Sequence, residues 1–220
     1  PDPAEEAAFV GIEINNAVWN APLPERYELM GVPFAAAGSM AQIFEDDLGG
    51  YAKPRWRMEW YDPGAGGYIP YDGPGFPPVE PGIGYWLIQR DPVPIDISGA
   101  TTSTAGGQDI TLEPGWNMIA APYLFTVPWS DVTLPFGVEE DLIGRTNDDY
   151  TVETELVPWR GYFVRHNGAT PVVINIPAAP SDKRAAPAEE PRDLEGVAWS
   201  VGIDVRQGDR TDLPKVIGAV

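Results

Sequence analysis

Carboxylates are the commonest chemically active side chains in this sequence, since 33 of its 220 residues are Asp or Glu. Two carboxylates about 5 to 9 Å apart across a cleft could hydrolyse glycosidic bonds. No spacing in the sequence predicts such a pair, so we expect solvated surface positions for Glu59, Glu139, Glu140 and Asp149. A serine hydrolase is not expected either, because no serine stands in a GxSxG turn and the single histidine, His166, has no evident acidic partner.

Two acidic loops suggest calcium as a second chemistry. They are FEDDLGG at 44–50 and EEDLIGRTNDD at 139–149, and neither has the spacing of an EF-hand. We expect them to be either solvated loops or calcium sites, and we expect no other cofactor. The candidate ligands are Asp46, Asp47, Glu139, Glu140, Asp148 and Asp149.

Aromatic residues suggest a third chemistry, the stacking of rings on sugar faces. The chain has 8 Trp and 9 Tyr, and they are densest in residues 51–71, at Tyr51, Trp56, Trp60, Tyr61, Tyr68 and Tyr71. Alternation along a strand predicts that Trp56 and Trp60 share one face and that the opposite face carries Arg55, Arg57, Glu59 and Tyr61. If they are exposed, Tyr68 and Tyr71 form the predicted glycan platform.

Composition limits the partners. The net charge of −19 repels phosphate groups over roughly 8 Å at physiological salt, so neither nucleic acid nor an anionic membrane is an expected partner. No apolar run approaches the ~18 to 20 residues of a spanning helix. The absence of cysteine excludes disulfides and leaves the compartment open, and a salty habitat would also favour such acidity. Because the chain begins at Pro1 without a signal sequence, we expect a processed product or a fragment.

Strands must position most of these side chains. With 24 Gly and 25 Pro in the chain, helical periodicity is confined to residues 38–48, where Ser39 is a suitable N-cap. Short apolar runs between turn signals predict strands at 9–14, 27–32, 55–61, 84–89, 109–112, 116–121, 150–156, 161–166, 171–176 and 197–205. We therefore predict an all-β fold with at most one or two short helices.

Two motifs recur in the same order and indicate two tandem β-sandwich or barrel-like repeats. RYELMGVPF at 26–34 matches GWNMIAAPY at 115–123, and PGIGYWLIQ at 81–89 matches PWRGYFVRH at 158–166. The glycine before each motif tyrosine predicts close backbone approach or a positive φ. We expect Tyr85, Trp116 and Tyr162 to be core residues, with a ligand platform as the alternative.

The predicted organisation has five segments. They are an N-terminal strand segment at 1–21, the first copy at 22–104, the second at 105–178, a Pro- and Ala-rich charged linker at 179–195 and a C-terminal strand segment at 196–220. The terminal strands VGIEI and VGIDV either pair with each other or are edges that pair with a neighbouring domain or subunit. Their candidate contact residues are Val10, Ile12, Ile14, Val201, Ile203 and Val205.

The motif pair GWNMIAAPY and PGIGYWL resembles tandem repeats of large multidomain extracellular proteins of bacteria, over residues 22–178. The most specific matches are Gly115, Trp116, Asn117 and Pro122 in the second copy and Pro81, Gly82, Gly84, Tyr85 and Trp86 in the first. The first copy departs at Tyr27 and Glu28, and the second at Trp159 and Arg160. The resemblance implies export to the bacterial surface or medium and a modular, non-catalytic role, with residues after the linker resembling the start of a further module.

Two functions of different kinds follow. The favoured hypothesis is a structural or assembly module that makes protein contacts, including contacts with itself, through its terminal strands. The alternative is a carbohydrate-binding module that uses exposed aromatic residues of the first copy. Growth into oligomers or fibres would support the first hypothesis, whereas a stable monomer would direct attention to polysaccharides.

Overall fold

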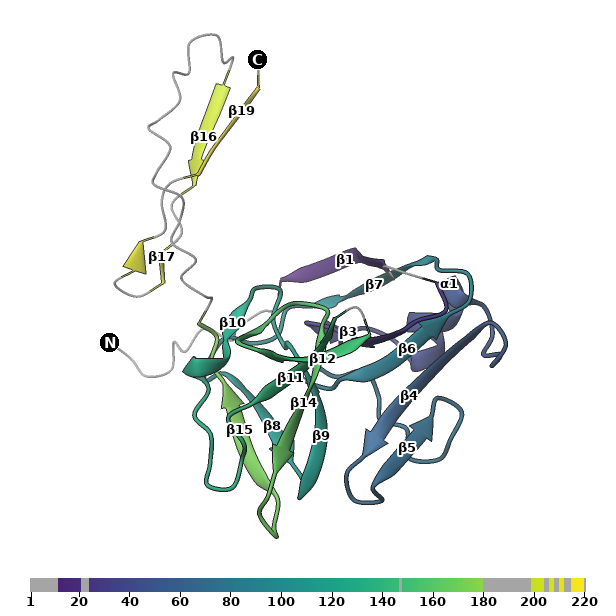
Figure 1. Ribbon diagram of the computed structural model, residues 1–220. Helices are drawn as coiled ribbons and strands as arrows, with labels where there is room; N and C mark the ends of the chain where they lie inside the picture. The colour runs from purple at the N-terminus through teal and green to yellow at the C-terminus, as the bar shows by residue number, and fades with distance from the viewer. Residues whose placement is uncertain are drawn as a thin grey trace. The chain divides into compact units, whose positions relative to one another are not determined.

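The computed structural model describes residues 12–20, 24–146 and 148–179, together with the backbone of short strands between residues 199 and 219. Its elements are almost all strands, which confirms the all-β prediction (Figure 1). The chain divides into one compact unit that ends at Ser181 and a second that begins at Asp182. No helix among the described residues is long and apolar enough to cross a membrane.

The first half of the larger unit contains seven strands and two short helical segments. They are β1 (Glu13–Asn20), β2 (Tyr27–Met30), β3 (Ala35–Ala36), η1 (Ala41–Glu45), α1 (Asp46–Leu48), β4 (Trp56–Asp62), β5 (Gly67–Pro70), β6 (Tyr85–Gln89) and β7 (Pro94–Ala100). One antiparallel sheet has the order β2-β6-β4-β5, and a second has the order β1-β7-β3. A hydrophobic core lies between them, and Trp56, Met58 and Tyr85 are among its most buried members.

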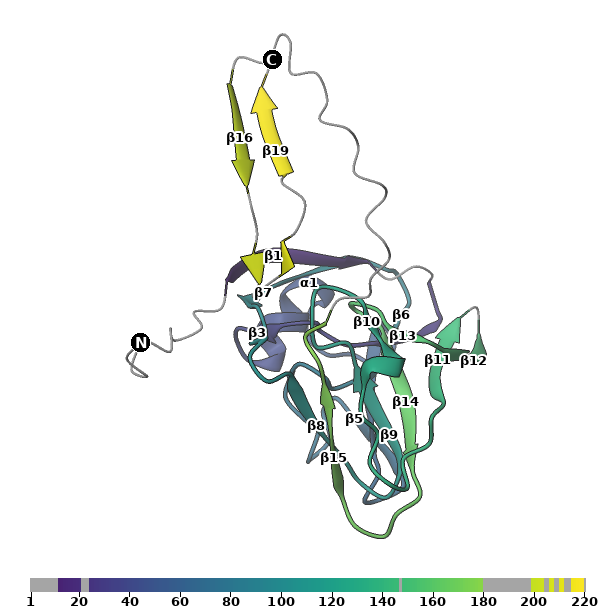
Figure 2. The same ribbon diagram turned by 90° about the vertical axis from the view of Figure 1, so that its left-hand side faces the viewer.

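The second half is built in the same way. Its elements are β8 (Gln108–Leu112), β9 (Gly115–Ala120), β10 (Val127–Pro128), η2 (Trp129–Asp131), β11 (Leu142–Thr146), β12 (Asp149–Glu153), β13 (Glu155–Leu156), β14 (Gly161–His166) and β15 (Val172–Ile176). A four-stranded sheet has the order β12-β11-β14-β9, and β8 pairs with β15 (Figure 2). Their core includes Leu112, Tyr162 and Ile174, all fully buried.

The two halves share one scheme of strand pairing. In the first half β2 pairs with β6, β6 with β4, β4 with β5, and β1 with β7. The corresponding pairs in the second half are β9 with β14, β14 with β11, β11 with β12, and β8 with β15. The motifs that recur in the sequence lie on β2 and β9 and on β6 and β14. Strand β1 is therefore part of the first half's fold rather than a separate terminal segment.

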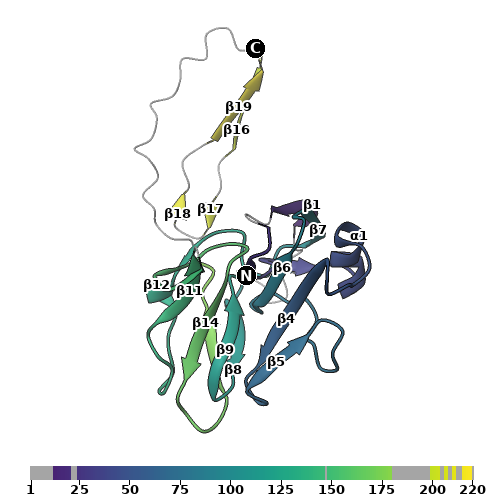
Figure 3. The same cartoon turned by 45° about the vertical axis from the view of Figure 1, so that its right-hand side comes forward.

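The two four-stranded sheets face each other (Figure 3). Their facing side chains form a third hydrophobic cluster, to which Leu29 and Trp86 contribute from the first half and Met118 and Phe163 from the second. The cluster is separate from the two sandwich cores. The larger unit consequently has three hydrophobic layers, one inside each half and one between the halves.

Main-chain hydrogen bonds join the halves with two-fold symmetry. The amide of Gly31 donates to the carbonyl of Trp159 at 3.2 Å, and the amide of Ala120 donates to the carbonyl of Gly82 at 2.9 Å. In the motif alignment Gly31 corresponds to Ala120 and Gly82 to Trp159, so exchanging the halves converts one bond into the other. A local two-fold axis therefore relates the halves.

The motif glycines are explained by this contact. A Cβ atom on Gly84 would lie 2.6 Å from the carbonyl oxygen of Ile119, and one on Gly161 would lie 2.9 Å from that of Met30. This confirms the predicted close approach of backbones. The position two residues earlier has a positive φ in both copies, at Gly82 (94°) and Trp159 (68°). The tryptophan thus keeps the glycine-like turn.

Most predicted elements are present. Ser39 Oγ accepts the amide of Gln42 at 3.4 Å at the start of the expected helical segment. In the larger unit, β3, β5, β7, β10 and β11 were not expected. β1 overlaps the first predicted strand, 9–14, at residues 13 and 14, and residues 9–11 lie outside the described residues. β1 pairs with β7 on one side, and the pairing of the two terminal strands with each other stays a prediction. In the smaller unit β16 (Trp199–Ile203) pairs with β19 (Lys215–Ala219), and β17 (Arg206–Gln207) with β18 (Arg210–Thr211).

Candidate ligand-binding site

The facing sheets gather aromatic side chains from both halves. Alternation along the strands turns seven rings towards the space between the sheets: Tyr27, Tyr61, Tyr68, Trp86, Trp116, Tyr150 and Phe163. Trp86 and Phe163 are buried at the base, whereas Tyr68, Trp116 and Tyr150 are 50%, 38% and 62% exposed. Because exposing large rings is unfavourable unless they serve a contact, this surface is the strongest candidate for binding.

The buried rings hold the exposed ones in place. Tyr27 meets Trp86 edge-on, with centroids 6.1 Å apart, and Trp116 meets Phe163 edge-on at 6.3 Å. Trp86 and Phe163 are themselves 6.0 Å apart across the contact between the halves. Tyr27 aligns with Trp116 and Trp86 with Phe163, so the local two-fold axis relates the two edge-on pairs. Such pairs fix ring orientation, and the surface is therefore preformed.

Two adjoining pockets open along this surface. The mixed pocket, of about 300 Å³, is lined by Tyr27, Glu59, Tyr68, Trp86, Arg145, Asp148 and Tyr150. The apolar pocket, of about 370 Å³, is lined by Tyr61, Tyr68, Trp116, Ile143, Tyr150 and Phe163. Tyr68 and Tyr150 belong to both, so one tyrosine from each half stands where the pockets meet. A ligand that filled both pockets would contact both halves.

The pockets are equivalent in position and different in polarity. Strand register places Glu59 opposite Trp86 and Ile143 opposite Phe163. In the next positions along these strands that face the pockets, Tyr61 lies opposite Tyr68, and Arg145 lies opposite Tyr150. Exchange of the halves therefore replaces Glu59 by Ile143 and Arg145 by Tyr61. The same framework gives one pocket lined by charged groups and one whose lining contains none.

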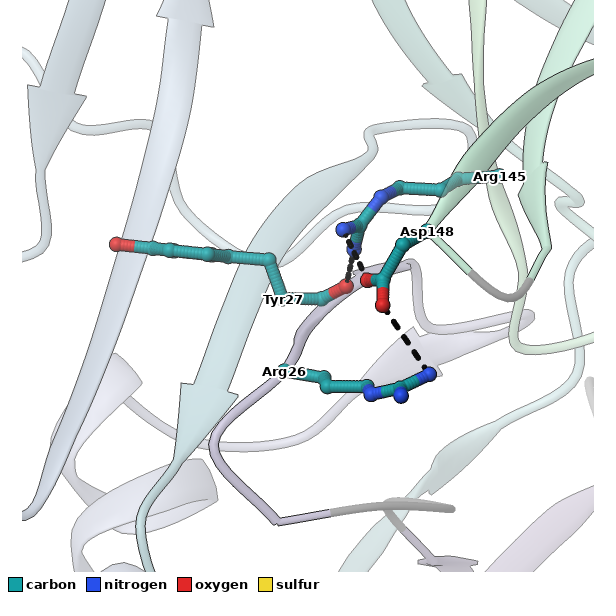
Figure 4. A network of polar contacts seen from close by, with 4 residues as sticks. All are labelled: Arg26, Tyr27, Arg145 and Asp148. Carbon is teal, nitrogen blue, oxygen red and sulfur yellow. Dashed lines mark hydrogen bonds and ion pairs between the residues drawn. The ribbon is translucent and has the colours of Figure 1, made fainter.

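Arg145 is fixed by a network that connects the halves (Figure 4). It donates hydrogen bonds to the main-chain oxygen of Tyr27 and, at 2.5 Å, to a carboxylate oxygen of Asp148. The other Asp148 oxygen lies 3.1 Å from the guanidinium of Arg26. The Arg145 guanidinium also lies over the Trp86 ring, 5.3 Å from its centroid. These contacts neutralise Arg145 locally and hold it against the wall of the mixed pocket.

Tyr68 presents a neutral hydroxyl to the site. Burial raises its pKa, as do Tyr150, Tyr61 and Glu59 nearby, while a side-chain hydrogen bond with Trp86 lowers it. The net effect is an increase, so the phenol keeps its proton across the physiological range. It can donate to and accept from a ligand hydroxyl, as a sugar requires.

The predicted glycan platform is only half present. Tyr68 lies on the pocket surface, but Tyr71 lies on the other side of the sheet, where its ring is 4.9 Å from both Tyr51 and Trp56. Its hydroxyl donates to Glu45 at 3.0 Å, and it packs against the first core. The two tyrosines are three positions apart, and alternation sends residues with odd spacing to opposite faces. The pairing of Tyr68 with Tyr71 is therefore corrected to Tyr68 with Tyr150.

The core prediction holds for two of three aromatic motif residues. Tyr85 and Tyr162 are fully buried and hydrogen-bonded, Tyr85 to the carbonyl of Pro78 and Tyr162 to the amide of Val157. The prediction is wrong for Trp116, which is 38% exposed and lines the apolar pocket. Its strand was predicted correctly, but its side chain faces the four-stranded sheet of the first half rather than the core of its own half.

The acidic calcium candidates are dispersed. Among the described residues, no group of three or more potential metal ligands is brought together. An Asp47 carboxylate oxygen accepts the amide of Asp96 at 2.8 Å, and Glu139 accepts the side-chain amide of Asn167 at 2.8 Å. Asp148 is held by two arginines. The remaining candidates, Asp46, Glu140 and Asp149, lie in α1, before β11 and in β12 respectively.

The terminal contact residues are partly described. Ile12 is 71% exposed, whereas Ile14 is half-buried against the first core. Val201 and Ile203 lie in β16, and Val10 and Val205 lie outside the described residues. His166 is buried, with Nε2 2.8 Å from the carbonyl oxygen of Thr170, and its contacts are those of a structural residue.

Sequence reasoning missed Tyr27, Trp86, Arg145, Tyr150 and Phe163 as site residues. A usable signal existed in the motif alignment, because Tyr27 aligns with Trp116 and Trp86 with Phe163. Arg145 has no such signal because its strand, β11, was not expected, and Tyr150 begins a predicted strand whose pairing with β11 was therefore not foreseen.

No family model matches the chain, and neither the curated proteins nor the solved structures contain a significant match.

Proposed function

We propose that residues 12–179 are a non-catalytic carbohydrate-binding module of an exported bacterial protein, with the mixed and apolar pockets as its glycan site. The observation that carries the proposal is the row of exposed rings, Tyr68, Trp116 and Tyr150, around two adjoining pockets. Rigid rings supply apolar area at low entropic cost, and the tyrosine hydroxyls can exchange hydrogen bonds with sugar hydroxyls. Cell-surface or extracellular location belongs to the same proposal and is supported by the motif resemblance.

The test is binding of the full chain to a glycan array, followed by calorimetry on each glycan retained. Replacing Trp116 or Tyr150 by alanine is expected to weaken binding about tenfold or more, because truncated aromatic anchors commonly cost ~2 kcal/mol. Phe136→Ala is the matched control, since Phe136 is 101% exposed and lines neither pocket. Retention of no glycan, or equal binding by all three variants, would contradict the proposal.

Assembly with a second copy of the chain is the second candidate. It is favoured by β1, an edge strand of its sheet that exposes Val18 and directly follows the exposed Ile12. The strand pairing is irregular between Ile14 and Ala17, and Asn16 has a φ of 50°. Because bulges blunt an edge, assembly ranks below glycan binding.

Light scattering over a wide concentration range tests assembly. If β1 pairs with β1 of another copy, mass rises with concentration and Ile12→Lys abolishes the rise. A mass that stays at the monomer value of 23.9 kDa throughout would reject self-assembly.

A further inference from the structure

Cationic side chains are concentrated in one place on this acidic protein. Four of the 14 Lys and Arg residues of the chain line a third pocket, of about 250 Å³, which we name the basic pocket. Its lining consists of Glu25, Lys53, Pro54, Arg55, Trp56, Arg57, Ile88 and Arg90. The lining thus carries four cationic groups and one anionic group, in a molecule whose net charge is −19.

The strand register places like charges next to each other. The amide of Arg90 donates to the carbonyl of Arg55 at 2.9 Å, so the two residues are cross-strand neighbours at the end of the β4–β6 pair. Like charges in that relation destabilise a sheet. A bound anion would remove this repulsion.

The contacts that these cationic side chains make within the protein leave hydrogen-bond donors available for a ligand. Arg90 Nε lies 2.9 Å from an Asp91 oxygen, and Lys53 Nζ is 4.0 Å from Asp72, but these pairs are exposed. In the part of the chain that the structure describes, Arg57 donates only to the main-chain oxygen of Lys53, at 3.2 Å. Within the described residues Arg55 makes no ion pair. Guanidinium groups with free donors suit the planar or tetrahedral oxygens of carboxylate and sulfate.

The basic pocket lies on the same sheet face as the glycan site. Alternation along β4 puts Arg57, Glu59 and Tyr61 on one side, and Glu59 lines the mixed pocket. In β6, Ile88 of the basic pocket is likewise two residues from Trp86 of the mixed pocket. At about 3.3 Å per residue, Arg57 and Tyr61 are about 13 Å apart along the strand. One elongated ligand could therefore reach all three pockets.

We propose that the basic pocket binds an acidic group of the glycan, so that the ligand is a heteroglycan with an isolated carboxylate or sulfate beside neutral sugars. The inference rests on the proposed glycan site. A uniformly charged polymer is disfavoured, because its next acidic groups would meet Glu59 and Asp148 in the mixed pocket. Along this face of β4 the side chains are first cationic (Arg57), then anionic (Glu59) and then aromatic (Tyr61). This order matches a ligand that has one acidic unit at one end and neutral sugars beyond it.

Calorimetry with oligosaccharides of matched length tests the inference. The probes are xylotetraose, a xylo-oligosaccharide with one methylglucuronosyl branch, a neutral oligosaccharide with one sulfate, and an oligogalacturonate. We expect one singly acidic probe to bind about tenfold more tightly than the neutral probe, because hydrogen bonds to charged groups are among the strongest. The carboxylate and sulfate probes identify which acid the pocket prefers.

A double variant assigns the effect to the pocket. Arg55→Gln with Arg57→Gln is expected to abolish the preference while binding of the neutral probe, which reports the folded glycan site, stays unchanged. Equal affinity for neutral and acidic probes, an unchanged preference in the variant, or tightest binding of the oligogalacturonate would each overturn the inference and leave the glycan site standing. Binding of no glycan at all would overturn the proposed function and this inference together.

Discussion

Gly84 and Gly161 connect a sequence motif to the contact between the halves. Each precedes a fully buried motif tyrosine, and each brings its strand close to a carbonyl oxygen of the other half. A side chain at either position would have to displace main chain, which yields less readily than a flexible side chain. The glycine is required by the neighbour across the two-fold axis rather than by a turn.

Gly84→Ala and Gly161→Ala are expected to lower the free energy of unfolding by about 1 to 3 kcal/mol, the usual cost of overpacking. The larger loss is expected at Gly84, where the added Cβ would be 2.6 Å from an oxygen rather than 2.9 Å. Gly67→Ala is the matched control, because a Cβ there meets nothing within 4 Å. Denaturant unfolding measures all three, and a control as destabilised as Gly84→Ala would contradict the explanation.

At the scale of elements, β1 is the strand whose role differs most from the sequence-based expectation. It was expected to be an interaction edge, and among the described strands it pairs on one side only. Its other side pairs with β7, and it places Trp19, only 9% exposed, in the first core. The strand is therefore structural whatever it contacts outside.

Trp19→Ala is expected to destabilise the protein by about 3 to 5 kcal/mol, the range for truncating a buried tryptophan. Val18→Ala, on the same strand at 52% exposure, is expected to change stability by less than ~0.5 kcal/mol. Denaturant unfolding followed by circular dichroism gives both values. Similar, small effects of the two substitutions would show that β1 does not belong to the first half's core.

The strands that could be predicted from the sequence are those whose apolar residues form unbroken runs, such as β6 and β14. β7 was missed because Pro92 and Pro94 stand directly before its alternating Ile95 and Ile97, and β11 because Gly144 interrupts a short run. Proline is tolerated at the first residue of a strand, and β7 begins with it. A local sequence pattern therefore fails to predict strands that are stabilised mainly by pairing with other strands.

The site was less predictable than the fold. Tyr68 was identified because aromatic residues are dense in residues 51–71, a signal that needs no knowledge of the strands. Tyr150 and Phe163 become site residues only because the four-stranded sheet of the second half faces that of the first half. This arrangement depends on contacts between residues far apart in sequence. The same reason explains Trp116, whose strand was correct and whose side-chain direction was not.

At the scale of the whole molecule, each half carries a buried tyrosine whose proton is tied to folding. Burial raises the pKa of Tyr162 to about 12, and burial also raises the pKa of Tyr85. An unfolded tyrosine titrates near ~10. The folded state therefore holds the proton more tightly, so this contribution to stability is present below pH ~10 and is lost as pH rises towards 12.

Alkaline titration should therefore unfold both halves. We expect tyrosinate absorbance from the buried residues to appear together with loss of the far-ultraviolet circular dichroism signal between pH ~10 and ~12. Tyr162→Phe is expected to shift the loss of the second half to higher pH. Ionisation of every tyrosine with an intact circular dichroism spectrum would show that the hydroxyls are not protected by folding.

The main-chain hydrogen bonds across the two-fold axis, from Gly31 to Trp159 and from Ala120 to Gly82, do not depend on the peptide that links β7 to β8. A polypeptide cleaved in that link, between the exposed residues Ala105 and Gly106, would keep the hydrogen bonds and the hydrophobic cluster that join the two halves. Two separately produced fragments could then reconstitute one particle. Tyr68 and Tyr150 would then come from different fragments, so a ligand bound between them would stabilise the association of the fragments. The extent of fragment complementation would therefore report ligand binding.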